Sequence, residues 1–364
     1  MNPLELVRAD LREFAGYASA RRQAQGGSVL LNANESPWAA PGDSLGLNRY
    51  PSPQPEALLA ALADLYQVDA GSLLVGRGSD EAIDLLVRAC CEAGRHAVLI
   101  SPPTFGMYAV CARVQNAGIV RVPLRAERGF ALDVEAVLEA VDDSVRMVFV
   151  CSPNNPSGGI VPIPALRRLA EGLDGRALLV VDEAYAEFAE TVSAISLVRE
   201  HRHVAVLRTL SKAYALAGAR IGSLIADPDL IRVLRNLMAP YPLPTPSVQA
   251  ALQALQPQSV ALAASRVGLI RQERARLTAR WRALSGVREV YASQANFLLL
   301  RVDDAEAVMR AAADRGIVLR KPDFAGVDLV SVEGGFVRIS IGSPEQNDAL
   351  LDVFGAGAGQ ERAA

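Results

Sequence analysis

Lys212 is the residue of this sequence whose surroundings point most directly to chemistry. It follows the apolar run Val204–Leu207 and comes directly after Ser211. Ligands of open α/β sheets bind at the carboxyl ends of strands. A partly desolvated lysine at such an edge, with a cation such as Arg220 nearby, can have its pKa lowered enough to form a Schiff base. Taken alone, the Ser-Lys pair is more typical of a surface lysine after a strand.

Acidic, phenolic and amide side chains follow two other apolar runs. Asp182 and Tyr185 come after Leu178–Val181, and Asn155 lies in the proline- and glycine-rich turn after Met147–Val150. An aspartate there can pair with a protonated ring nitrogen, and an asparagine amide in a fixed turn can donate or accept a hydrogen bond. Each also has an ordinary alternative, since aspartate often caps a helix and asparagine often stabilises a turn.

A phosphate group and a flat ring would each find a suitable contact elsewhere. The segment 76–80, Gly-Arg-Gly-Ser-Asp, opens a predicted amphipathic helix, Ser79–Cys91, whose first N–H groups could bind a phosphate. A dinucleotide fingerprint would need a third glycine where Glu81 stands, and no apolar strand of the usual length precedes the segment, so we reject NAD binding. Phe105, after the run Ala97–Ile100, could stack on a ring or simply belong to the core.

These signals are weak one by one and specific in combination. An amine, a carboxylate, a phenol, an amide, a guanidinium, an aromatic ring and a helix N-terminus all follow successive apolar runs. Parallel strands would bring them to one edge of a sheet. The set suits pyridoxal phosphate, a flat phosphorylated pyridine aldehyde that acts as an electron sink. The sequence therefore predicts this cofactor and no metal.

The runs that must position these residues predict an α/β fold with a mostly parallel central sheet covered by helices. Further strands are expected at Ile119–Val122 and Gly222–Ala226, before a proline-rich break at 239–244. Beyond the break, a smaller α+β unit is expected from two helices, Pro257–Leu284 and Ala305–Asp314, and two strands, Phe297–Arg301 and Val337–Ile341. We expect residues 1–45 to form an N-terminal arm that joins the small domain, 46–243 the large cofactor-binding domain, and 244–364 the small domain.

Length, charge and cysteine spacing exclude some kinds of partner and location for this protein. A chain of 364 residues suggests about two domains. It has 37 Lys and Arg against 40 Asp and Glu, a net charge of −3 without a basic block, which disfavours nucleic acid or membrane partners. Its four cysteines show no Cys-x-x-Cys spacing, and its first residues form no apolar signal segment. We therefore expect a reduced, cytoplasmic protein.

The sequence resembles the fold-type I, class II aminotransferases that use pyridoxal phosphate, and is most similar to the histidinol-phosphate aminotransferases. The matching stretches run in family order over nearly the whole chain: 31–38, 49–51, 78–83, 102–108, 153–158, 181–185, 209–222, 296–298 and 337–342. Phe105 stands where the family often has tyrosine. The resemblance implies transamination of histidinol phosphate with 2-oxoglutarate, giving imidazole acetol phosphate and glutamate in histidine biosynthesis, by a homodimer with shared active sites.

The resemblance also implies roles for individual residues. Lys212 matches the Schiff-base lysine and Asp182 the partner of the pyridine nitrogen; these two are the expected catalytic residues. Asn155 and Tyr185 match the partners of the ring oxygen, and Phe105 the stacking residue. The phosphate cradle matches Ser79, Asp80, Ser211 and Arg220, with Tyr50 reaching in from the other protomer. The expected substrate contacts are Tyr17, Asn34, Arg320 and Arg338.

Other functions remain open from the sequence. One is an aromatic amino-acid aminotransferase, and another is a decarboxylase of a phosphorylated amino acid with the same cofactor. A cofactor-binding regulator with a DNA-reading module is disfavoured, because the roughly 50 residues before the sheet show no helix-turn-helix pattern. A need for 2-oxoglutarate without release of carbon dioxide would identify a transaminase.

Overall fold

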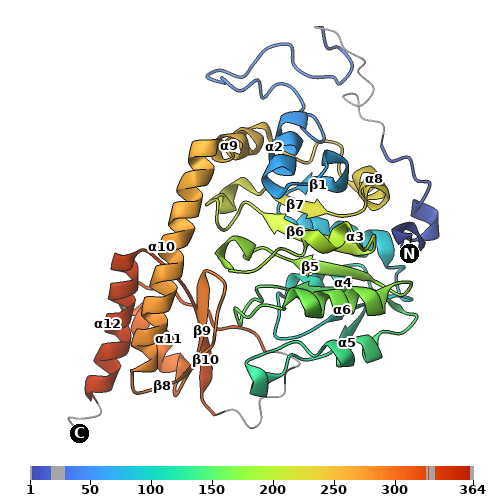
Figure 1. Cartoon of the computed structure of the whole chain (residues 1–364). Helices are drawn as coiled ribbons and strands as arrows, with labels where there is room; N and C mark the ends of the chain where they lie inside the picture. Colours follow the sequence, from blue (N-terminus) through green and yellow to red (C-terminus); the bar gives the residue numbers. More distant parts are fainter. Residues whose placement is uncertain (1, 18–28, 325–326, 328–332, 361–364) are drawn as a thin grey trace.

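The computed structural model describes residues 2–17, 29–324, 327 and 333–360. Within these residues, two sheets carry the strands (Figure 1). The larger sheet contains β1 Leu73–Gly76, β2 Ala97–Ile100, β3 Gly118–Arg121, β4 Val145–Cys151, β5 Leu178–Asp182, β6 Val204–Thr209 and β7 Gly222–Ile225. The smaller sheet contains β8 Val287–Val290, β9 Phe297–Val302 and β10 Gly335–Ser340. The α-helices are α2 Glu56–Tyr66, α3 Ser79–Cys90, α4 Met107–Val114, α5 Val134–Ala140, α6 Ile163–Leu173, α7 Ile195–Val198, α8 Pro228–Leu237, α9 Thr245–Ala254, α10 Pro257–Arg282, α11 Ala305–Ala313 and α12 Pro344–Gln360.

The predicted mostly parallel sheet is confirmed. Its strand order is β1-β7-β6-β5-β4-β2-β3, and the strands from β6 to β3 pair in parallel. β7 runs antiparallel to both of its neighbours. Because β4, β5 and β6 are parallel neighbours in register, Cys151 lies beside Asp182, and Asp182 beside Leu207. The segments that follow these strands therefore begin at one edge of the sheet.

Two apolar layers cover the two faces of this sheet, as the uninterrupted apolar strands predict. One layer packs α2, α5, α6, α7 and α9 against alternate strand residues such as Val148 and Val181. The other packs α3, α4 and α8 against the intervening residues, such as Phe149 and Val180. Side chains that alternate along a strand thus fill both cores, and the strands position their carboxyl ends rigidly.

The smaller sheet forms a separate α+β layer with its own core. Its strand order is β10-β9-β8, all antiparallel, and α10, α11 and α12 pack against it. The long helix α10 runs beside both sheets, and the proline-rich segment 239–244 lies in the connection between α8 and α9 (Figure 1). The domain boundaries expected at residues 45 and 243 stay a prediction.

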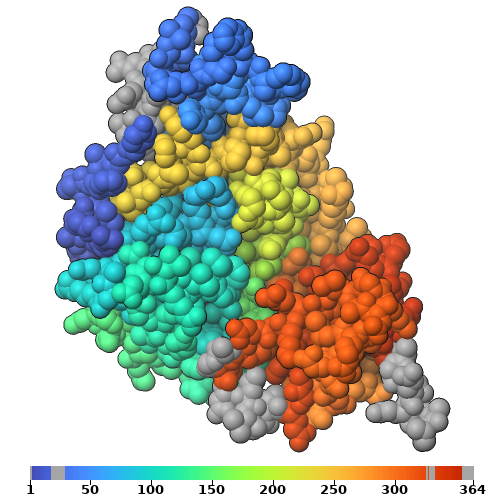
Figure 2. All heavy atoms as spheres, turned by 180° about the vertical axis from the view of Figure 1, so that it is seen from behind, coloured from blue at the N-terminus to red at the C-terminus, as the bar shows by residue number. Residues whose placement is uncertain are grey.

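Two details differ from the sequence expectations. The strand β1 precedes the glycine segment after all; it spans four residues and pairs antiparallel with β7, which is why no long apolar run marks it. The described start of the N-terminal arm does not pack on the smaller unit. Leu6 and Val7 are buried with α3 and α8 of the larger sheet, because their apolar side chains complete that layer. Seen from behind, the N-terminal residues and the smaller unit lie at opposite ends of the molecule (Figure 2).

A buried ionic cluster joins the segment that follows β5 to the strand β6. The guanidinium of Arg208 donates to Glu183 Oε2 at 3.0 Å and to Glu187 Oε1 at 2.7 Å. It also lies 5.1 Å from the ring centre of Tyr66. Glu183 in turn accepts hydrogen bonds from Ser193 Oγ and from the backbone N–H of Ala194. The cluster therefore holds the chain after β5 against β6.

We expect Arg208→Met to lower the free energy of unfolding by about 3–5 kcal/mol, because it leaves two carboxylates buried without their cation. Urea unfolding followed by circular dichroism measures this loss. Arg167→Met is the matched control, since Arg167 pairs with Glu200 on the surface, where such a pair contributes about 0–1 kcal/mol. Equal losses in the two variants would contradict the role of the buried cluster.

Candidate active site

A cavity of about 140 Å³ lies at the carboxyl ends of β4, β5 and β6. Every cofactor residue predicted from the sequence, apart from Tyr50, lines it. The predicted lining residues are Ser79, Asp80, Phe105, Asn155, Asp182, Tyr185, Ser211, Lys212 and Arg220. Residues from six separate segments of the chain therefore meet at one edge of the sheet, as the parallel topology requires.

Asp182, the last residue of β5, supplies a buried carboxylate at the wall of the cavity. Asp182 is only 2% exposed to solvent. Its Oδ2 accepts a hydrogen bond from Tyr108 Oη at 2.7 Å, and its Oδ1 accepts one from the N–H of Ala184 at 3.1 Å. Burial raises the pKa of this carboxyl to about 6, although both hydrogen bonds act in the opposite direction. A positively charged partner in the cavity would favour the ionised form.

Lys212 lies in the turn that follows β6 and is open to the cavity. Partial burial of its ammonium lowers the pKa below the ordinary lysine value, and the positive charges of Arg338 and Arg220 add to the effect. Its Nζ also lies 5.7 Å from the ring centre of Tyr185. A lysine amine in this setting is available as a nucleophile or as a base.

Another part of the cavity wall has the features of an anion site. It is formed by the N-terminus of α3 and by Arg220, whose Nη2 lies 3.1 Å from Asp80 Oδ2. Gly78 has φ +85°, and a Cβ there would come within 2.4 Å of Arg220 Nη2. Glycine thus lets the guanidinium lie against the start of the helix, where backbone N–H groups favour a phosphate. Asp80 orients the arginine by charge.

Phe105, Asn155 and Tyr185 provide the remaining ring and amide contacts. Asn155 Oδ1 accepts a hydrogen bond from Arg338 Nη1 at 2.5 Å, which connects the turn after β4 to β10 of the smaller sheet. Tyr185 is buried, and burial raises the pKa of its phenol, so it stays a neutral donor at pH 7. A pyridine ring with an oxygen substituent could stack on Phe105, pair its protonated nitrogen with Asp182 and accept hydrogen bonds at its oxygen from Asn155 and Tyr185. The site therefore fits the predicted cofactor.

The four predicted substrate residues and Tyr50 do not line the cavity of this single chain. Arg338 contacts the lining residue Asn155, to which it donates a hydrogen bond. Arg320 pairs with Arg338 through an isolated backbone bridge. Tyr50 is half exposed and stacks on Tyr241, with ring centres 4.3 Å apart.

Tyr17 is exposed, in the segment beside α8, where Asn236 Nδ2 donates to the carbonyl of Phe14. Asn34 is exposed and has φ +55° in the arm. The single chain therefore does not bring Tyr17 or Asn34 to the cavity.

Sequence reasoning missed three side chains with hydroxyl or thiol groups at the site. Thr209, Cys151 and Tyr108 line it or contact Asp182. Thr209 Oγ1 donates to Ser211 Oγ at 2.9 Å and so orients the hydroxyl of that serine. The position of Thr209, two residues before Ser211 at the end of a strand, could have identified it. Nothing in the sequence shows that Tyr108 contacts Asp182.

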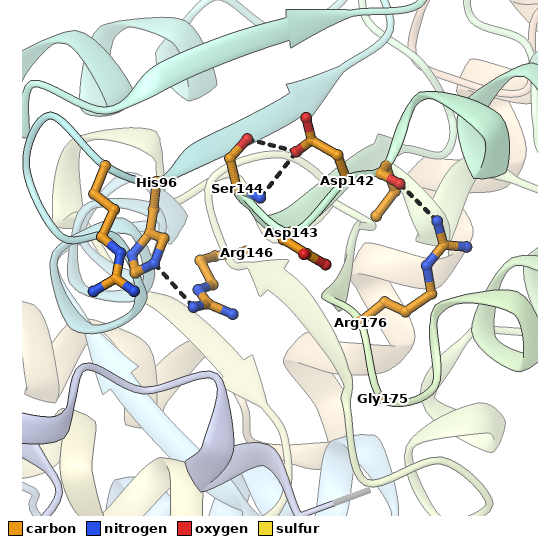
Figure 3. A pocket seen from close by; sticks show the side chains of 9 residues that line it. His96, Asp142, Asp143, Ser144, Arg146, Gly175 and Arg176 are labelled. Carbon is orange, nitrogen blue, oxygen red and sulfur yellow. Dashed lines mark hydrogen bonds between the residues drawn. The ribbon is translucent and has the colours of Figure 1, made fainter.

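A larger cavity, of about 540 Å³, lies at the opposite edge of the sheet, where β2, β4 and β5 begin (Figure 3). Its lining includes His96, Asp142, Arg146 and Arg176, and His96 and Arg146 point toward one another. None of the residues singled out from the sequence lines it. Within the described ranges there is also no acidic, His or Cys cluster suited to a metal ion, and no helix with the length and apolar character to cross a membrane.

Comparison with known proteins agrees with this geometry. The sequence profile of the family aminotransferase class I and II matches residues 27–354. The histidinol-phosphate aminotransferase of Stenotrophomonas maltophilia is 52% identical over 356 residues, which cover 97% of this chain and 96% of that protein.

Two solved structures share the fold. That of histidinol-phosphate aminotransferase from Sinorhizobium meliloti, in complex with pyridoxal-5'-phosphate, has a TM-score of 0.74 at 27% identity, covering 85% of this chain and 84% of that one. The L-threonine-O-3-phosphate decarboxylase of Porphyromonas gingivalis has a TM-score of 0.71 at 22% identity, covering 85% and 91%. The fold alone therefore does not separate the two reactions, whereas the sequence does: this chain belongs to the class I and II aminotransferases, and its relatives at about half identity are histidinol-phosphate aminotransferases.

Proposed function

We propose that this chain transfers the amino group of histidinol phosphate to 2-oxoglutarate, with pyridoxal phosphate as cofactor. The products are imidazole acetol phosphate and glutamate, a step of histidine biosynthesis. The observation that carries the proposal is the cavity in which Asp182, Lys212 and Arg220 meet, in a chain about half identical to histidinol-phosphate aminotransferases over nearly its full length. The cytoplasmic location expected from the sequence stays a prediction.

Pyridoxal phosphate, when bound, supplies a ring that takes up the electron pair released at the carbon bearing the substrate amine. Asp182 would hold the proton on the ring nitrogen by charge, since a carboxylate favours a cationic partner. Asn155 and Tyr185 would donate to the ring oxygen, and Phe105 would lie against the ring. Ser79, Ser211 and Arg220 would bind the phosphate, with Asp80 orienting Arg220.

Lys212 has two proposed tasks, both at its Nζ. It would hold the cofactor through the aldehyde carbon, and it would also act as a base toward the substrate. A base is most effective when its pKa lies near the working pH, and partial burial and neighbouring arginines lower the pKa of Lys212 in that direction. The Nζ amine would accept the proton from the substrate carbon that bears the amino group.

The substrate's phosphate would be bound by two arginines of the smaller unit. Histidinol phosphate has a phosphate dianion far from its amine and no α-carboxylate. A guanidinium group can donate two parallel hydrogen bonds to two oxygens of a phosphate. The backbones of Arg320 and Arg338 pair with each other, with N···O distances of 3.3 and 2.8 Å. Glutamate would use Arg338 in the other half-reaction. Tyr17 and Asn34 are proposed to complete the site from the N-terminal arm.

The arm also supports the proposed homodimer. Leu31 and Trp38 are 86% and 79% exposed, and Tyr50 is half exposed near them in the sequence. Large apolar side chains in such numbers are typical of a surface covered by a partner. Glu35 holds this segment in shape, because its carboxylate binds Arg49 and accepts the backbone N–H of Tyr50. We propose that Tyr50 reaches the phosphate in the partner's site.

A donor screen tests the function directly. With pyridoxal phosphate and 2-oxoglutarate, the purified chain is expected to form glutamate from histidinol phosphate with a kcat/KM at least tenfold above that for phenylalanine or tyrosine. No carbon dioxide should be released. Higher kcat/KM for the aromatic amino acids would favour an aromatic aminotransferase. Carbon dioxide from a phosphorylated amino acid without 2-oxoglutarate would indicate a decarboxylase.

Mixed dimers test Lys212 and Tyr50 together. Lys212→Ala is expected to fold and bind the cofactor without covalent attachment, yet to lose turnover, and Tyr50→Phe to bind the phosphate more weakly. If Tyr50 acts across the interface, hybrids of the two carry both defects in one site and neither in the other. Their activity should then exceed that of either parent. Hybrids no more active than the parents would place Tyr50 in its own chain's site.

The two arginines should differ in what they recognise. Arg320→Ala is expected to raise KM for histidinol phosphate about 10- to 100-fold, the scale of a charge-assisted hydrogen bond, with a far smaller effect on glutamate. Arg338→Ala should impair both half-reactions. Arg310→Ala, an exposed arginine on α11, is the control for loss of charge in the same unit. Equal losses for both substrates in Arg320→Ala would disprove the phosphate contact.

A further inference from the structure

We propose that Tyr108 is a positioning residue for Asp182, which it fixes and keeps ionised from behind the cavity so that the carboxylate can face a cationic ring. The inference rests on the proposed function, since it concerns the role of Asp182 toward the cofactor. Tyr108 is the second residue of α4 and does not itself line the cavity. It would therefore act through Asp182 without touching substrate or cofactor.

Tyr108 is held in one orientation by its neighbours. It is 0% exposed, and its ring stacks on Phe149 of β4 with ring centres 4.6 Å apart and planes 5° apart. The ring of Phe105 contacts it edge to face at 5.6 Å. A ring fixed on two sides loses little freedom when its hydroxyl donates a hydrogen bond. The Tyr108 hydroxyl is thus aimed at Asp182 before any ligand binds.

The hydrogen bond uses one carboxylate oxygen and leaves acceptor capacity for the cavity. Tyr108 Oη donates to Oδ2, while the backbone N–H of Ala184 donates to Oδ1. Each carboxylate oxygen can accept about two hydrogen bonds, so both oxygens can accept another. Two donors that come from different segments also fix the plane of the carboxylate. Without Tyr108, the backbone N–H of Ala184 would be the only remaining hydrogen-bond donor to the Asp182 carboxylate among the residues that the structure describes.

Charge explains why such a donor is needed. Asp182 is buried, and burial favours its protonated form, which cannot hold a cationic partner by charge. The titratable groups that interact with it are Tyr108 of α4, Cys151 of β4, Asp80 of α3, and Glu183, Tyr185 and Lys212. The negative charges of Asp80 and Glu183 further disfavour its ionisation, so the Tyr108 hydroxyl acts against all three effects.

The test is the titration of Asp182 in the full-length chain freed of cofactor. Labelling with ¹³C at the side-chain carboxyl gives a resonance for each aspartate. The resonance that is missing in Asp182→Asn belongs to Asp182. Loss of a hydrogen bond to a charged group should raise the midpoint of this titration in Tyr108→Phe by about one to two pH units. An unchanged midpoint would overturn the proposal.

Tyr66→Phe is the matched control, because Tyr66 is a buried tyrosine in the layer on the other face of the sheet. Its loss of a hydroxyl should leave the Asp182 midpoint in place. Site-specific replacement of Tyr108 by 3,5-difluorotyrosine keeps the ring and makes the hydroxyl a stronger donor. This variant should lower the midpoint, and it tests the proposal even if Tyr108→Phe does not fold. A midpoint that stays or rises would contradict it.

Cofactor affinity separates this inference from the proposed function. Asp182→Asn should weaken retention of pyridoxal phosphate, and Tyr108→Phe should do so at pH 7 and recover as the pH rises above the new midpoint. Wild-type retention in Asp182→Asn would overturn the role of Asp182 itself. A shifted midpoint together with weak retention in Asp182→Asn supports both proposals.

Discussion

The buried guanidinium of Arg208 is the contact on which the arrangement of the site depends. It joins Glu183 and Glu187, which follow β5, to the strand β6. Asp182 is the neighbour of Glu183 in the sequence, and Thr209 is the neighbour of Arg208. A buried ion pair gives little net stability compared with apolar packing, but it is costly to break and so specifies one arrangement. The ends of β5 and β6 are thereby held in the register that places Asp182 and the Ser211–Lys212 turn at one cavity.

The site concentrates charges that the fold alone would avoid. Asp182 is buried against its preference for water, and the three cations Lys212, Arg220 and Arg338 are near enough for Arg220 and Arg338 to lower the pKa of Lys212. Such an arrangement costs stability, and sites that bind a charged ligand commonly bear this cost. A ligand with a cationic ring nitrogen and a phosphate would offset these costs, since the nitrogen brings a counter-charge to Asp182 and the phosphate adds negative charge beside the cations.

The larger sheet could be predicted well because its central strands are covered on both faces and appear as continuous apolar runs. β2, Ala97–Ile100, has the predicted bounds, and β5 and β6 differ at their ends only. The missed strands have weaker patterns: β1 is short, and β8 is mostly exposed. The cavity residues were predictable because parallel topology brings strand ends together. The Tyr108 contact was not predictable, because it depends on how α4 packs on β4. The packing of Leu6 and Val7 was not predictable either, because it depends on the space that α3 and α8 leave in their layer, which no local sequence pattern shows.

Contacts of α10 connect the two halves of the site. Arg271 donates to the carbonyls of Glu187, Phe188 and Ala189, and Arg274 donates to those of Phe188 and Ala295. The first group follows β5, and Ala295 precedes β9, which pairs with the strand that carries Arg338. Hydrogen bonds from arginines and the pairing of β9 with β10 therefore link the cluster around Arg208 to the smaller sheet through α10. On that sheet, Arg338 donates to Asn155. Because the same contacts place Asp182 and Arg338, the fold fixes the separation between the carboxylate of Asp182 and the guanidinium of Arg338.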